Sequence, residues 1–172
     1  MSTAEKNLSS FNDASLPDAS SMRIGIVVSE WNHSITSNLL KGAQELLEQA
    51  GIQPQNLHVH WVPGSFELPS AAAMLLEHIE DLDGVITLGS VIRGETAHFD
   101  YVCQGVALGV KDVSLKYLKP VIFGVLTDDT KDQAEARSGG KHGNKGIEAA
   151  VTCVQMVALR NKLIADKQKP SA

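Results

Sequence analysis

Cysteine is scarce in this sequence of 172 residues. Cys103 and Cys153 are the only two, they stand fifty residues apart, and no CxxC pair occurs. A secreted disulfide scaffold would need more cysteines than this. Both residues lie in apolar segments, so we expect buried, reduced thiols.

Long hydrophobic runs and basic clusters are also missing. No stretch approaches the roughly 18 apolar residues of a membrane span, and the N-terminal residues contain no apolar signal-peptide core. The 15 Lys and Arg residues are scattered rather than interleaved with aromatics, unlike those of a nucleic-acid-binding face. We therefore expect a cytoplasmic protein with no membrane or nucleic-acid partner.

The remaining composition is that of an ordinary globular protein, with 43% hydrophobic residues and a net charge of −5. The length suits one domain with a sizeable core and is too short for two. Residues 1–21 are rich in Ser, Asn, Asp and Ala without an apolar period, which predicts a flexible N-terminal arm. Residues 22–165 are expected to form a single domain, and residues 166–172 a flexible tail.

The apolar pattern alternates four times between strand and helix. Buried, β-branched strands are predicted at 23–28, 84–92 and 120–127, and a half-polar edge strand at 57–62. Each is followed by a segment with helical spacing, of which the last runs from about residue 145 to 163. This order predicts an α/β fold: a flavodoxin-like, three-layer α/β/α sandwich with a four-stranded parallel sheet and helices on both faces.

Polar and aromatic side chains gather after the predicted strands rather than before them. The loops leaving the first three strands contain Trp31, Ser65-Phe66-Glu67 and the run 93–98. Ligands of open parallel sheets bind beyond the carboxyl ends of the strands. Two of these residues have simpler interpretations, because Trp31 could cap the core edge and Glu67 could only favour a helix start. His98 opens a helix, where a cation is disfavoured, so a neutral imidazole that shuttles protons is predicted.

The segment 137–146 holds four glycines and three cations just before the last helix. Backbone N–H groups at a helix start, with Arg137 and Lys145, suit a phosphate group, although a solvated glycine-rich connector is the alternative. The GxxxxGK[ST] and GxGxxG motifs are absent. His58 and His60 alternate on one strand without an evident third ligand, so no metal site is expected.

At these loops the sequence resembles the lumazine synthase family, which catalyses the penultimate step of riboflavin biosynthesis. The resemblance spans about 150 residues and rests on Trp31-Asn32, VPGSFELP (62–69), LGSVIRGETAHFDYV (88–102), PVIFGVLT (120–127) and GNKG (143–146). It implies a transferase that condenses 5-amino-6-(D-ribitylamino)uracil with 3,4-dihydroxy-2-butanone 4-phosphate. The products would be 6,7-dimethyl-8-ribityllumazine, phosphate and water, and no cofactor or metal is implied.

The resemblance also implies a role for each matching residue. His98 would transfer protons, and Arg137, with Lys145 as a weaker candidate, would hold the phosphate. The other expected substrate-binding residues fall in four groups: Trp31 on the pyrimidine, Ser65, Phe66 and Glu67 on the ribityl chain, Ser90, Val91 and Ile92 on the pyrimidine edge, and Glu95 and Thr96 on the butanone phosphate. A Glu side chain repels phosphate, so Glu95 would act through its backbone N–H.

The resemblance further implies a homopentamer with its active sites between subunits, in which Phe123 reaches the uracil substrate in the neighbour's site. Some members of the family build a 60-subunit icosahedral shell, and the short connector 139–146 is similar to theirs. The Trp31 position is more often Phe in the family, which raises the hypothesis of flavin binding. A flavin-binding or shell-forming protein without catalysis is therefore the alternative function.

Overall fold

The computed structural model describes residues 16–168 and contains one four-stranded parallel sheet. Its strands lie in the order β2-β1-β3-β4, where β1 is Ile24–Ser29, β2 is Leu57–Val62, β3 is Gly84–Ile92 and β4 is Val121–Asp128. All six residues of the inner strand β1 are buried, whereas β2 is half exposed. The predicted strands and the edge position of the second are confirmed.

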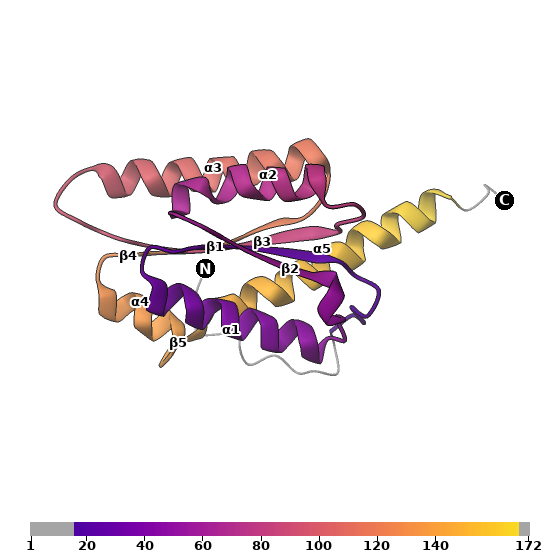
Figure 1. The fold of residues 1–172 in the computed structure, drawn as a ribbon, viewed down its shortest axis with the longest axis horizontal. Coiled ribbons are helices and arrows are strands. Elements are labelled where there is room, and N and C mark those ends of the chain that lie inside the picture. The colour runs from indigo at the N-terminus through magenta and orange to yellow at the C-terminus, as the bar shows by residue number, and fades with distance from the viewer. Residues whose placement is uncertain (1–15, 169–172) are drawn as a thin grey trace.

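Helices cover both faces of this sheet (Figure 1). On one face lie α2 (Leu68–His78) and α3 (His98–Tyr117), and on the other lie α1 (His33–Gln49), α4 (Lys131–Arg137) and α5 (Lys145–Lys167). Each face has its own apolar cluster, around Ile26 and Leu39 on the α1/α5 side and around Val27 and Leu76 on the α2/α3 side. The α/β three-layer fold is therefore confirmed.

Helices α1 and α5 approach each other closely at the start of α5. A Cβ atom on Gly146 would overlap the backbone carbonyl of Leu39, so only glycine fits there. The Asn144 side chain caps α5 by accepting the Gly146 N–H (2.8 Å) and donates to the Asn38 carbonyl of α1 (2.8 Å). The glycine-rich segment thus serves as a docked helix start.

The segment between β4 and α5 contains more structure than the sequence pattern predicts. Thr130 caps the short helix α4 by accepting the Gln133 N–H. A two-stranded hairpin follows, formed by β5 (Ser138–Gly140) and β6 (Gly143–Asn144). These elements are too short to give an apolar period, and they lie where a plain connector was expected.

Two further details differ from expectation or extend it. Helix α5 continues to Lys167, beyond the predicted end near residue 163. Cys153 is buried, but Cys103 is only half-buried, so the prediction of two buried thiols is wrong for Cys103. The reason is that α3 buries the narrow stripe of Phe99, Val106 and Val110, and Cys103 lies at its margin.

The predicted terminal segments fall largely outside the described residues. Of the arm 1–21, only residues 16–21 are described, and there Ala19 is buried and donates its N–H to the Ala50 carbonyl (2.9 Å). Of the tail 166–172, residues 169–172 are not described. Within 16–168, no helix has both the length and the hydrophobicity to cross a membrane.

Two short 3₁₀ helices complete the chain path: η3 (Pro54–Asn56) leads into β2, and η4 (Ser65–Glu67) leads into α2. Pro69 lies in the first turn of α2.

Candidate active site

The sheet opens a crevice at the carboxyl ends of β1 and β3. These strands are neighbours, but the chain leaves β1 for α1 on one face and leaves β3 for α3 on the other (Figure 1). Such a divergence between adjacent parallel strands is where ligands of open α/β sheets bind.

The loop after β1 holds Trp31 by backbone contacts. Glu30 and Trp31 donate their N–H groups to the carbonyls of Val62 (2.8 Å), the last residue of β2, and Pro63 (3.3 Å), which follows it. Asn32 has a left-handed φ of 58° and donates its side-chain amide to the Ser90 carbonyl (2.9 Å). The backbone is therefore fixed on two sides, while the Trp31 side chain remains 73% exposed.

The loop after β2 forms the 3₁₀ turn η4. Ser65 is buried against β3, where a Cβ atom on Gly89 would come within 2.6 Å of its hydroxyl. Phe66 and Glu67 are exposed, and the Phe66 ring lies against Gly105 of α3. The turn thus anchors Ser65 and presents the next two side chains outward.

The end of β3 contributes Ser90, Val91 and Ile92. Ser90 is buried, and its hydroxyl has no hydrogen-bond partner within residues 16–168. Its carbonyl is engaged by Asn32. A buried hydroxyl without a partner is costly, so Ser90 is suited to bind a polar ligand group.

Arg93 clamps the loop that leads from β3 to His98. Its guanidinium contacts both carboxylate oxygens of Asp100 (3.0 and 3.3 Å), donates Nε–H to Asp129 (2.8 Å), and lies 4.1 Å from the centre of the Phe99 ring. The hydrogen bonds to Asp100 and then Asp129 raise the pKa of Arg93. These contacts join the ends of β3 and β4 to the first turn of α3, which begins at His98.

These loops enclose one cavity of about 640 Å³. Eight of the predicted site residues line it: Trp31, Ser65, Phe66, Glu67, Ser90, Val91, Ile92 and His98. Asn32, Gly64, Tyr101 and Val102 complete the lining and were not among the predicted site residues. All four lie within the matching motifs, which is the signal that could have found them.

Glu95 and Thr96 do not line this cavity. Both are exposed, and the Thr96 hydroxyl accepts a long hydrogen bond from the His98 backbone N–H (3.4 Å). Their predicted contact with the butanone phosphate stays a prediction.

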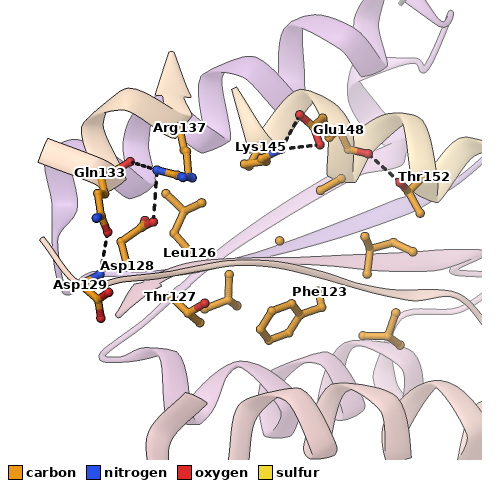
Figure 2. Close-up of a pocket in the computed structure, with 15 residues that line it drawn as sticks. Phe123, Leu126, Thr127, Asp128, Asp129, Gln133, Arg137, Lys145, Glu148 and Thr152 are labelled. Atoms are coloured by element: carbon orange, nitrogen blue, oxygen red, sulfur yellow. Dashed lines mark hydrogen bonds and ion pairs between the residues drawn. The ribbon is translucent and has the colours of Figure 1, made fainter. Parts of the chain in front are cut away.

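Phe123 and Arg137 line a second cavity, of about 810 Å³, which runs along β4 beside α4 and α5. Figure 2 shows Arg137 on the α4/α5 side of β4 and Phe123 on the opposite side of that strand. Lys145 also lines this cavity, together with Asp128, Asp129, Gln133 and Glu148. Arg137 donates to the Gln133 carbonyl (3.0 Å) and lies 3.6 Å from Asp128, while Lys145 donates to both carboxylate oxygens of Glu148 (2.8 Å each). Within one chain the expected site residues are therefore divided between two cavities.

The acidic residues of the second cavity were missed by sequence reasoning. Asp128 is 7% exposed, and burial raises the pKa of its carboxyl group more than the nearby charge of Arg137 lowers it. Nothing in the run VLTDDT distinguishes the buried Asp128 from the exposed Asp129. The structure does so, because Asp128 is the last residue of β4 and is buried, whereas Asp129 follows the strand and is exposed.

No group of three or more His, Cys, Asp or Glu side chains within residues 16–168 is arranged to hold a metal ion. His58 and His60 of β2 do not belong to such a group. His60 faces solvent. The pKa of His58 is lowered, first by burial and then by the charges of Arg23 and His60.

Residues 21–161 match the model of a family described as 6,7-dimethyl-8-ribityllumazine synthase. Three proteins of that name are similar: those of Parabacteroides distasonis (55% identity, 91% of this chain and 98% of that protein), Cytophaga hutchinsonii (53%; 92% and 98%) and Porphyromonas gingivalis (52%; 92% and 98%).

The match covers the whole sheet, all three loops of the first cavity, and α4 with most of α5 at the second. Fold, site position and sequence similarity thus agree over the same residues, and this chain belongs to the 6,7-dimethyl-8-ribityllumazine synthase family.

Proposed function

We propose that this protein condenses 5-amino-6-(D-ribitylamino)uracil with 3,4-dihydroxy-2-butanone 4-phosphate to give 6,7-dimethyl-8-ribityllumazine, phosphate and water, in riboflavin biosynthesis. One observation carries the proposal. The family match extends over residues 21–161, and eight side chains of the matching motifs line a single cavity beyond the strand ends.

The first cavity would bind the ribitylaminouracil. The exposed Trp31 indole offers a flat apolar face for stacking on the pyrimidine. Glu67 would accept hydrogen bonds from ribityl hydroxyls, and the Ser90 hydroxyl, which has no partner among residues 16–168, would meet a polar edge of the ring. His98 would move protons during ring closure, since the attacking amine is part of the substrate.

The second cavity would hold the phosphate and complete a neighbouring subunit's site. Arg137 and Lys145 are the cations there, and Phe123 supplies an aromatic face. Because these residues lie away from His98 within one chain, we propose a homopentamer in which one subunit's second cavity faces the next subunit's first cavity.

The assembly can be tested by light scattering. A single pentamer and a 60-subunit shell of twelve pentamers differ twelvefold in mass. A particle of pentamer size alone would exclude the shell, and a monomer would exclude an intersubunit site. A cytoplasmic location, and the absence of any cofactor, stay predictions from the sequence.

The experiment that tests the reaction mixes purified, metal-free protein with both substrates and follows lumazine fluorescence. A rise that requires the protein and each substrate is expected. A folded oligomer that gives no rise would overturn the proposal and favour the alternative of a flavin-binding or shell-forming protein. Riboflavin would then be tested as a ligand through quenching of the fluorescence of Trp31, with Trp31→Phe as the control for Trp61.

A further inference from the structure

The second cavity combines cations with an excess of carboxylates. Five charged residues line it: Asp128, Asp129 and Glu148 carry negative charge, and Arg137 and Lys145 carry positive charge. Each cation has a carboxylate within 4 Å, Asp128 for Arg137 and Glu148 for Lys145 (Figure 2). A phosphate group that enters must therefore compete with protein carboxylates for both cations.

The two pairs are built differently. Lys145 donates to both oxygens of Glu148 at 2.8 Å, one helical turn away on α5. The Asp128–Arg137 separation of 3.6 Å is too long for a hydrogen bond, and the hydrogen bond that Arg137 donates goes to the Gln133 carbonyl. Asp128 therefore acts on Arg137 through charge and is not needed to hold its geometry.

The carboxylate charge of Asp128 is also poorly compensated by its surroundings. It is 7% exposed, and its Oδ2 atom has no hydrogen-bond partner within residues 16–168. A buried carboxylate is unfavourable unless it is paired and hydrogen-bonded, so Asp128 is not explained by a stabilising role in the fold. Its position beside Arg137 gives Asp128 an electrostatic role instead.

We infer that Asp128 sets how tightly this cavity holds phosphate, by offsetting the charge of Arg137. The inference rests on the proposed function, in which Arg137 binds the phosphate of the butanone substrate. Phosphate is also a product, so affinity gained for the substrate's phosphate is equally affinity for the product. A carboxylate next to Arg137 weakens the binding of both the substrate's phosphate and the product phosphate. It therefore favours release of the product.

The test compares Asp128→Asn with the wild-type assembly in a calorimetric titration with inorganic phosphate at pH 7. The amide keeps the shape and removes the charge, so phosphate should bind about tenfold more tightly, the scale on which one nearby charge acts. In steady-state kinetics, KM for the butanone phosphate should fall and inhibition by phosphate should increase. Asp132→Asn is the matched control, because Asp132 is an exposed carboxylate in the first turn of α4.

An affinity in Asp128→Asn that is no higher than in Asp132→Asn would show the inference to be wrong. Arg137→Ala separates this failure from that of the proposed function. If Arg137→Ala loses phosphate binding while Asp128→Asn is unchanged, the phosphate role of Arg137 stands and only the role of Asp128 fails. If Arg137→Ala binds phosphate normally, the assignment of Arg137 fails as well. Should the Asn variant not assemble, Asp128→Ser removes the same charge and carries the same expectation.

Discussion

His98 stands at the start of α3 with its side chain exposed toward the first cavity. Its backbone N–H donates to the Thr96 hydroxyl (3.4 Å), and Arg93 holds Asp100 in the same first turn of α3 (3.0 Å). A side chain held in this way can reach a substrate without being bound to other protein groups, as a general acid–base requires.

Replacing His98 with Ala should lower kcat by about 10²–10⁴-fold, the usual contribution of a general acid–base. Binding of the ribitylaminouracil, measured by titration, should largely survive, since Trp31 and Glu67 remain. His78→Ala is the control, because His78 is an exposed histidine at the end of α2 and lines neither cavity. An unchanged kcat in His98→Ala would remove this residue from the mechanism.

Asp128 predicts a pH dependence of stability. Burial raises its pKa in the folded protein, so the folded state keeps this proton to a higher pH than the unfolded chain does. The stabilisation from this group is complete below the ordinary carboxyl pKa of 3.8 and is lost as pH rises through the folded-state pKa.

Asp128→Asn should therefore unfold at a higher temperature than wild type at pH 7, with the difference shrinking as pH falls toward 4. Thermal unfolding followed by circular dichroism at pH 4, 5 and 7 measures this. A difference that is the same at all three values would mean that ionisation of Asp128 does not destabilise the fold.

At the level of single residues, the sequence is informative where a residue type is unusual for its place. An aromatic after a buried strand, at Trp31, and a histidine at a helix start, at His98, are of this kind. Asp128 and Gln133 look like ordinary loop residues in the sequence. Gln133 lies one turn before Arg137 within α4, whereas Asp128 is brought near Arg137 by the turn between β4 and α4, which has no periodic signal.

At the level of elements, the contact of α1 with α5 depends on a single glycine. Because a Cβ at Gly146 would overlap the Leu39 carbonyl, Gly146→Ala must push the two helices apart. Overpacking of this kind costs about 1–3 kcal/mol, and here the clash is with backbone, which cannot rotate away. We expect a lower unfolding midpoint in guanidinium chloride and weaker activity, since Lys145 begins the same helix.

The control is Gly94→Ala, for which a Cβ would meet nothing within 4 Å. Its unfolding midpoint should match that of wild type within error. If Gly146→Ala is equally stable, α1 and α5 can separate more easily than their packing indicates.

The long elements could be predicted because each has a period and a clear end. Helix α1, for example, closes at Gly51, which has a φ of 94°. Helix α4 and the β5–β6 hairpin have only seven, three and two residues. Elements this short are stabilised by their packing on β4 and α1, which no local pattern encodes.

At the level of the whole molecule, a single chain exposes aromatic side chains at both cavities. Trp31, Phe66 and Tyr101 line the first cavity and Phe123 the second, and all four are exposed. Aromatics of this kind are typical of surfaces that are covered by a ligand or a partner. Sequence periodicity cannot reveal this division between two cavities, because it describes which side chains face the interior of the chain.

The division of the site predicts that two inactive variants restore each other. His98→Ala damages only the first cavity and Arg137→Ala only the second. When both are co-expressed with different tags and mixed assemblies are isolated, a ring with random order has both halves intact at about a quarter of its interfaces. Lumazine formation should therefore recover to roughly that fraction of the wild-type rate.

The matched control for this experiment is a mixture of His98→Ala with Glu67→Ala. Both changes damage the first cavity, so no interface in that mixture has a complete site and activity should stay low. Recovery in the first mixture alone would assign the two cavities to neighbouring subunits. Mixed assemblies of His98→Ala and Arg137→Ala that stay inactive would instead require His98 and Arg137 to act within one chain. The two cavities would then have to be joined by a rearrangement around β4, since β3 and β4 separate them in the isolated subunit.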